Sequence, residues 1–274
     1  MSLLLAALLL LHFSLSRAFV ATSATRSCNY VSPVDVSRCC LSATLADLQD
    51  SLLEKVTAQT PLKSTDFAEA FGASEYGQFY DEVSPQHLTG VTKYTIGSTH
   101  SLDVWMGPSN DIPNSLLSFG EEEGGGTFFL MCDMVTRGAT PIGSDPQMID
   151  KYYTPAMAWA ASASSLGKSL PPPSSFNSRL VSSPLRVSVG DLSFEDVERL
   201  ANEHVDRWCS YVEDCQPIAA RLRGGFNARD DKLRQYFYRG KVEEYTALFG
   251  EEEGRTMAAI STGPISEAYV GGGS

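Results

Sequence analysis

The residues best suited to chemistry lie in one stretch near the C-terminus, residues 221–249. This stretch is basic within an acidic chain, and two adjacent carboxylates, Asp230 and Asp231, lie among its cations. A carboxylate in such surroundings is a candidate proton donor, while the cations suit an acidic partner. The competing interpretation is a solvated helix face with an acid favoured near a helix N-terminus. The cations are Arg221, Arg223, Arg229, Lys232, Arg234, Arg239 and Lys241.

A second acidic group, Glu121–Glu123, lies beside three consecutive glycines at 124–126. The apolar segments 115–123 and 127–135 flank these glycines, which predicts a β-hairpin. The glycines lead into a strand and not a helix, so they indicate a turn and not a phosphate-binding loop. The acids are then either a catalytic group at the strand end or the solvated tip of the hairpin.

Motifs for resident cofactors are missing from the sequence. There is no Walker A loop, no GxGxxG after a strand and no GxSxG. The histidines are scattered, and the cysteines that follow the N-terminal segment form no CxxC pair. We therefore expect neither a bound metal nor a nucleotide cofactor.

The order of the predicted elements indicates how these groups are positioned. Helices are expected after the capping sequence Thr44-x-x-Asp47 and again from residue 64 or 65. A block of strands follows, then a helix, a strand and three helices, of which the second ends at Gly250. This order predicts an α+β fold with a mainly antiparallel sheet covered by helices. The later elements are expected at 89–98, 101–106, 115–123, 127–135, 145–166, 180–189, 193–215, 229–248 and 251–261.

The N-terminal residues predict a targeting leader. Residues 3–11 form an apolar run shorter than the roughly 20 residues of a membrane span, which is typical of a signal peptide over 1–18. Residues 19–41 are rich in Ser and Thr with one acid, Asp35, as in a transit peptide. Together they indicate a bipartite leader for an algal plastid, with plain secretion as the alternative. Residues 42–274 are expected to form a single domain, and the net charge of −12 disfavours nucleic acid as a partner.

Four short pieces, in family order, resemble red chlorophyll catabolite reductase, a family of the ferredoxin-dependent bilin reductase superfamily. The pieces are Leu102–Gly107, Phe129–Asp133 followed by Arg137, Leu180–Pro184, and Arg229-Asp230 running on to Leu248-Phe249-Gly250. The resemblance implies an α/β/α sandwich with a central antiparallel sheet in a plastid enzyme. It further implies reduction of an open-chain tetrapyrrole without a bound metal or flavin, with electrons supplied by reduced ferredoxin.

The resemblance also implies roles for particular residues. Asp230 matches the catalytic aspartate near the C-terminal helix, with Asp231 as its close rival. Phe119 stands where the family has a catalytic glutamate, so we expect Phe119 to contact the substrate and Glu121, two residues on, to supply the carboxylate. Arg137 has the fork geometry to bind an anionic group of the pigment, unless it forms a surface salt bridge.

Arg229 has the same expected role and the same alternative as Arg137. Lys232, Arg234 and Lys241 are the predicted docking residues for ferredoxin, itself an acidic protein. Two other functions stay open: a bilin reductase for a haem-derived tetrapyrrole, and a tetrapyrrole-binding protein without catalysis. The sequence also leaves open the oligomeric state, with a homodimer as one option.

Overall fold

The computed structural model describes residues 44–66, 76–82, 88–107, 109–135, 137, 149–215 and 217–263. The predicted signal and transit segments lie outside these residues. No helix in the described part of the chain has the length and apolar character needed to cross a membrane.

The described strands form one sheet in the order β1-β2-β3-β4-β5-β6-β8-β7, and every neighbouring pair is antiparallel. The predicted hairpin is confirmed, because β5 and β6 pair from Asn114 opposite Val135 to Glu121 opposite Phe128. The strands are β1 (Leu62–Thr65), β2 (Gly77–Glu82), β3 (Leu88–Ile96), β4 (Thr99–Met106), β5 (Asn114–Glu121), β6 (Phe128–Val135), β7 (Lys168–Ser169) and β8 (Val187–Leu192).

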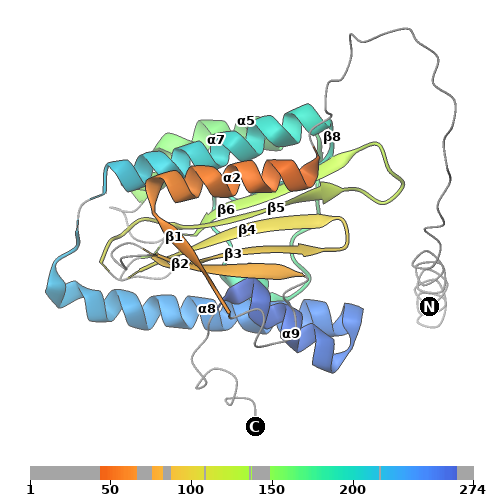
Figure 1. Cartoon of the computed structure of the whole chain (residues 1–274). Coiled ribbons are helices and arrows are strands. Elements are labelled where there is room, and N and C mark those ends of the chain that lie inside the picture. Colours follow the sequence, from red (N-terminus) through yellow and green to blue (C-terminus); the bar gives the residue numbers. More distant parts are fainter. Residues whose placement is uncertain are drawn as a thin grey trace, which may run out of the picture. The chain divides into compact units, whose positions relative to one another are not determined.

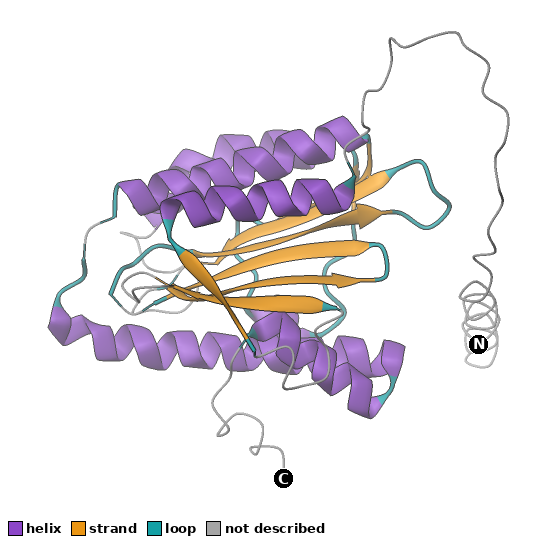
Figure 2. Ribbon diagram, in the orientation of Figure 1, coloured by secondary structure: helices purple, strands orange, loops and turns teal. Residues whose placement is uncertain are grey.

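Helices cover both faces of this sheet, so the predicted α/β/α arrangement of an α+β fold is confirmed (Figures 1 and 2). Helices α2, α5 and α7 lie on one face, and α8 and α9 lie on the other. The helices are α2 (Leu45–Gln59), α5 (Met157–Ser164), α6 (Phe176–Leu180), α7 (Phe194–Glu213), α8 (Ala220–Phe249) and α9 (Glu251–Thr262).

The main hydrophobic core lies between the sheet and α2, α5 and α7. Helix α7 begins after Ser193, whose hydroxyl accepts the backbone N–H of Asp196, and it buries Leu200 and Trp208 toward the strands. Helix α2 begins with the predicted capping box between Thr44 and Asp47. Both helix starts therefore follow from local sequence, and burial of their apolar faces holds them on the sheet.

Three predicted elements differ in the structure. Residues 62–65 form strand β1, so the helix expected from residue 64 or 65 does not begin there, and residues 67–75 of that prediction lie outside the described part of the chain. The segment expected as a strand from 180 to 189 begins as the end of helix α6, and strand β8 starts only at Val187, after Pro184. The helix expected from 145 to 166 is helical where it is described, from Ile149, but it passes from a π-helix (Ile149–Tyr153) through a 3-10 turn at Pro155, which cannot donate an N–H to a helical ladder, into α5; residues 145–148 lie outside the described part.

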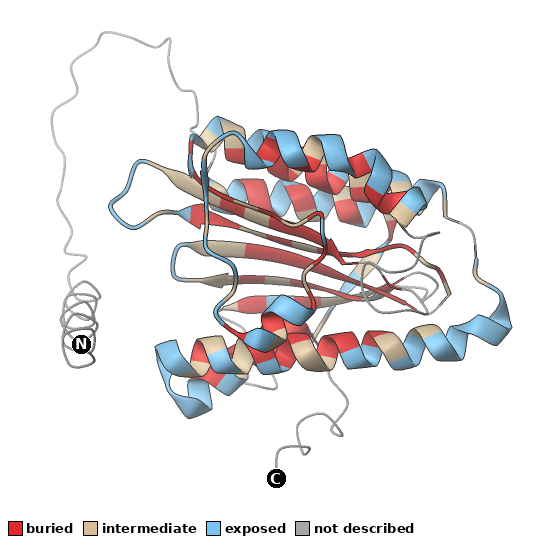
Figure 3. Ribbon diagram, turned by 180° about the vertical axis from the view of Figure 1, so that it is seen from behind, coloured by how far each residue is buried: buried red, intermediate tan, exposed pale blue. Residues whose placement is uncertain are grey.

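Helix α8 begins at Ala220, nine residues before the predicted start at Arg229. Gly224 and Gly225 lower the helix propensity of this stretch and hide its helical character in the sequence. Residues 220–225 are exposed on every side, because the helix extends past the edge of the sheet there (Figure 3). The predicted glycine end at Gly250 is confirmed, with a positive φ of 88°.

Candidate active site

Two buried aspartates lie in one row across the middle of the sheet, on the face covered by α8. Asp103 on β4 pairs with Leu116 on β5, and Leu116 pairs in turn with Asp133 on β6. The three side chains therefore share one face of the sheet, with the two aspartate Cα atoms about 10 Å apart across two strand spacings. Asp103 is 2% exposed and Asp133 is 5% exposed.

The Asp103 carboxyl is held by two hydrogen bonds. It accepts the backbone N–H of Leu117 at 3.2 Å, and the hydroxyl of Tyr94 on β3 donates to its other oxygen at 3.2 Å. Burial raises the pKa of Asp103 to about 7, although Lys241 and the two hydrogen bonds oppose this rise. A carboxyl with this pKa can hold a proton and release it near neutral pH.

The Asp133 carboxyl faces the segment that follows α6. It accepts the backbone N–H of Ser183 at 2.9 Å and a hydrogen bond from the Ser183 hydroxyl. Burial raises the pKa of Asp133 to about 6, and the Ser183 hydrogen bonds and the Arg186 charge lessen that rise. Asp133 is thus a second carboxyl whose pKa lies well above the ordinary value for an aspartate.

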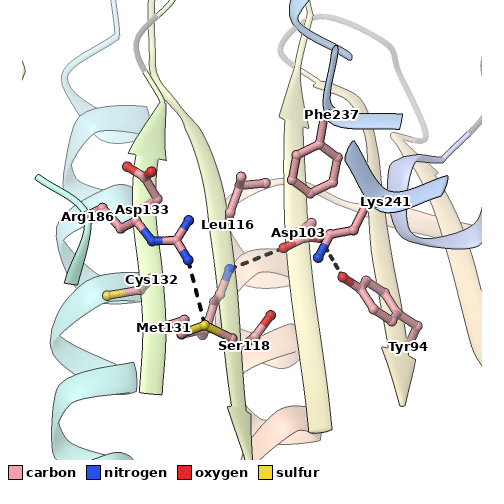
Figure 4. Close-up of a pocket in the computed structure, with 11 residues that line it drawn as sticks. Tyr94, Asp103, Leu116, Ser118, Met131, Cys132, Asp133, Arg186, Phe237 and Lys241 are labelled. Carbon is pink, nitrogen blue, oxygen red and sulfur yellow. Dashed lines mark hydrogen bonds between the residues drawn. The ribbon is translucent and has the colours of Figure 1, made fainter. Parts of the chain in front are cut away.

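Helix α8 and the segment around α6 close a cleft over this row. Figure 4 shows Asp103 and Asp133 from the sheet, with Phe237 and Lys241 from α8 above them. Two adjoining cavities share these walls, with volumes of about 70 Å³ and about 240 Å³. The second cavity continues between α8 and the prolines at 171 and 173.

Lys241 brings a positive charge to the cleft. Its ammonium lies 3.3 Å from the Glu244 carboxylate and 5.5 Å from the centre of the Phe237 ring. Burial alone would lower the pKa of Lys241, but Tyr245 and Glu244 outweigh it and raise that pKa. Lys241 therefore stays protonated and favours an anionic group in the cleft.

The outer wall of the cleft is tied to α8 by hydrogen bonds. Asn177 donates to Glu243 at 2.7 Å, and the Ser178 hydroxyl donates to Glu244 at 2.8 Å. Gly240 allows the close approach, because a Cβ at that position would collide with Ser178. The wall and the helix consequently hold the cleft in a defined shape.

The structure brings two of the predicted site residues together, but as partners of each other. Arg137 is fully buried, and its Nε lies 3.0 and 2.9 Å from the two carboxylate oxygens of Asp230. Its other nitrogens donate to backbone oxygens of Gly107, Asn110 and Ile112. This arrangement corrects the prediction for Arg137, whose guanidinium is used within the protein and does not line the cleft.

Asp230 is consequently placed as the anchor that joins α8 to the loop after β4. Burial raises the pKa of the Asp230 carboxyl, while the Arg137 charge opposes the rise. Lys241 lies eleven positions after Asp230 on the helix, which places them about 16 Å apart along its axis. In this conformation Asp230 does not line the cleft, and its predicted role in proton transfer stays a prediction.

The predicted strand residues also lie away from the cleft. Phe119 is completely buried in the core on the opposite face of the sheet, where its ring stacks on His100. It therefore cannot contact a substrate bound under α8, and this prediction is wrong. Glu121 is exposed at the hairpin end, and its carboxylate accepts the backbone N–H of Gly126 at 3.2 Å. The hairpin-tip interpretation fits this position.

The predicted docking cations divide into three environments. Lys232 is exposed on α8 and available to a partner protein. Arg234 is 8% exposed, donates to the Thr262 carbonyl at 2.8 Å and lies over the Trp105 ring, so its prediction as a docking residue is wrong. Lys241 faces the cleft, and Arg229 is half-buried beside Asp230.

Comparison with known proteins supports the fold. No protein-family model matches the chain, and no curated protein matches it. Among solved structures, the chain is similar to phytochromobilin synthase from tomato in complex with biliverdin, with a TM-score of 0.58 and 14% identity. The match covers 80% of this chain and 83% of that chain. The protein therefore has the α/β/α sandwich fold of that synthase.

Proposed function

We propose that this protein is a ferredoxin-dependent reductase of an open-chain tetrapyrrole. The observation that carries the proposal is the pair of buried carboxyls with raised pKa values, Asp103 and Asp133, in one row beneath a cleft that α8 covers. The fold shared with phytochromobilin synthase, which was crystallised with biliverdin, supports it. The short resemblances to red chlorophyll catabolite reductase support it independently.

The chemistry requires two electrons and two protons for each double bond that is reduced. Ferredoxin supplies the electrons one at a time, and the conjugated pigment carries the unpaired electron between the two steps. Asp103 donates one proton and Asp133 the other; each O–H bond breaks as its proton bonds to the reduced pigment, and the carboxylate left behind is later reprotonated from solvent. This scheme requires no resident cofactor.

Asp103 is the better general acid of the two near neutral pH. Its pKa is raised to about 7, whereas that of Asp133 is raised to about 6, so more of Asp103 is protonated at pH 7. Tyr94 orients the Asp103 carboxyl through its hydroxyl. Turnover should therefore decrease as the pH rises through about 7.

The electron donor is proposed to dock on the outer side of α8. Lys232 and Arg239 are both exposed and lie seven residues apart, hence on one side of the helix. The opposite side of α8 carries Phe237 and Lys241 into the cleft. A donor bound there would be separated from the pigment by about one helix diameter, on the order of 10–12 Å.

Red chlorophyll catabolite is the first proposed substrate, because the sequence pieces resemble its reductase. Biliverdin is the second candidate, since the structurally similar synthase binds it. The leader proposed for residues 1–41 would direct the enzyme to a plastid, where reduced ferredoxin and both pigment classes are expected.

An anaerobic assay with reduced ferredoxin tests the proposal. Either pigment is supplied, and product formation is followed by absorbance and fluorescence. We expect turnover of one pigment and its loss in Asp103→Asn, while Asp150→Asn, an exposed carboxylate outside the cleft, retains it. Binding without any turnover would identify a pigment-binding protein, and no binding of either pigment would refute the proposal.

A further inference from the structure

A third cavity adjoins the proposed pigment cleft and is lined by cations and hydroxyls. Among the described residues its charged side chains are both arginines, and none of the described carboxylates lines it. It is contiguous with the cleft, because Pro173, Ser182 and Arg186 line both spaces. The lining residues are Ser164, Ser169, Leu170, Pro172, Pro173, Arg179, Ser182, Arg186 and Ser188.

Arg186, at the junction of the two spaces, has donors to spare. Its Nη1 donates to the Ser182 hydroxyl at 3.2 Å, and its Nη2 faces the Met131 sulfur at 3.7 Å, which is a weak acceptor. Its buried Nε has no hydrogen-bond partner in the part of the chain that the structure describes. A guanidinium whose N–H donors are not all used by the protein can bind a planar oxyanion through two parallel hydrogen bonds.

The neighbouring carboxyl does not satisfy Arg186. Asp133 is near enough for the arginine charge to lower its pKa, but both Asp133 oxygens accept hydrogen bonds from Ser183. Among the described residues no ion pair joins Arg186 to any acid. The positive charge at the junction is therefore open to a ligand; Figure 4 shows the Arg186 guanidinium between Asp133 and Met131.

The rest of the cavity wall adds donors of the same kind. The buried Ser188 hydroxyl has no hydrogen-bond partner among the described residues. Arg179 uses one nitrogen, Nη1, to hold the backbone carbonyls of Pro173 and Ser174 at 3.0 and 2.8 Å. Its remaining N–H groups are not engaged by these contacts.

We infer that this cavity is an oxyanion site in which Arg186, Arg179 and Ser188 bind a carboxylate. If the proposed function holds, this ligand is a carboxylate side chain of the tetrapyrrole, whose conjugated part lies over Asp103 and Asp133. The recognition that the sequence resemblance assigned to Arg137 then belongs to Arg186. The same donors would also accept a free oxyanion such as inorganic phosphate.

The first experiment compares two pigments that differ only in charge. Biliverdin and its dimethyl ester are titrated by absorbance against the wild-type chain, Arg186→Gln, Arg179→Gln and Arg199→Gln. Arg199 lies on α7, on the other face of the sheet, and pairs with Asp196 and Glu203, so it is the matched control. Wild type and control should prefer the diacid by about tenfold or more, because charge-assisted hydrogen bonds contribute on the order of one such factor each.

Arg186→Gln should reduce this preference by about tenfold without weakening ester binding, and Arg179→Gln should reduce it by a smaller factor. Thermal unfolding of each variant verifies that it is folded. An unchanged preference in folded Arg186→Gln would overturn the site.

The second experiment uses inorganic phosphate alone and is independent of the pigment. A rise in the unfolding midpoint with phosphate that disappears in Arg186→Gln but remains in Arg199→Gln would assign the site to a free oxyanion. If pigment binding shows no charge preference and phosphate has no Arg186-dependent effect, the inference is wrong. If the chain binds neither pigment, the proposed function is refuted. The oxyanion site is then tested only by whether phosphate raises the unfolding midpoint in an Arg186-dependent way.

Discussion

Replacement of Asp103 by Asn should remove a pH-dependent loss of stability. The unfolded chain releases the Asp103 proton near its ordinary pKa of 3.8, whereas the folded chain keeps it until about pH 7. Between these values the folded state binds the additional proton, so the free energy of unfolding falls as the pH rises. The loss is complete about one pH unit above the folded pKa of about 7, and it is constant beyond that.

The magnitude follows from the size of the pKa shift. The step from 3.8 to about 7 corresponds to about 4 kcal/mol at 1.36 kcal/mol per unit, which is an upper limit for this one group. Asparagine resembles the protonated acid in shape and can keep both hydrogen bonds, one from the Leu117 N–H and one with the Tyr94 hydroxyl. The variant should therefore be as stable as wild type at low pH and more stable above neutrality.

Urea unfolding across this pH range is the assay. Asp133, with a raised pKa of about 6, contributes its own slope at lower pH. The difference between wild type and Asp103→Asn therefore isolates Asp103, and its slope falls from about 1.2 kcal/mol per pH unit at pH 6 to about 0.7 at pH 7. Asp231→Asn, an exposed carboxylate on α8, should keep the wild-type slope. If Asp103→Asn also keeps it, the carboxyl is ionised in the folded protein and its assignment as a general acid fails.

Three further outcomes are expected. Arg137→Ala should lower the free energy of unfolding by about 3–5 kcal/mol in urea titrations, because it leaves a buried carboxylate unpaired; a cost below about 1 kcal/mol would contradict the anchor. The double variant Lys232→Glu with Arg239→Glu should raise the KM for ferredoxin several-fold at low salt without altering pigment binding, whereas Lys63→Glu on β1 should not; equal effects at high and low salt would exclude steering. Gly240→Ala should destabilise the protein by about 1–3 kcal/mol, since the added methyl group would collide with α6, and unchanged thermal unfolding would contradict that packing.

The fold was predictable where local signals agreed with the packing. The β5–β6 hairpin followed from its glycine turn, and α7 followed from Ser193 and an apolar stripe at helical spacing. The strand predicted at 180–189 began too early. Its apolar residues fit a strand, but Pro184 belongs to the turn that leads into β8. No local pattern distinguishes these alternatives, and the tertiary position of α6 decides between them.

The candidate site was harder to predict, although a signal was available. Asp103 and Asp133 each stand alone among apolar residues of a strand, and a single acid in such a place is seldom fully buried without a role. The sequence could not show that Leu116 aligns them in one row, since strand register is a long-range property. It also could not show that Arg137 and Asp230, 93 residues apart, satisfy each other.

The alternation of side chains along β5 and β6 has an evolutionary consequence. Phe119 and Leu130 point into the core beneath α2 and α7, while Leu116 and Ser118 point into the cleft beneath α8. Selection for a folded protein acts on the first set, and selection for the ligand of the cleft acts on the second. Neighbouring codons can therefore drift under separate pressures, so a lineage can change its substrate by altering every second residue of two strands while the fold persists.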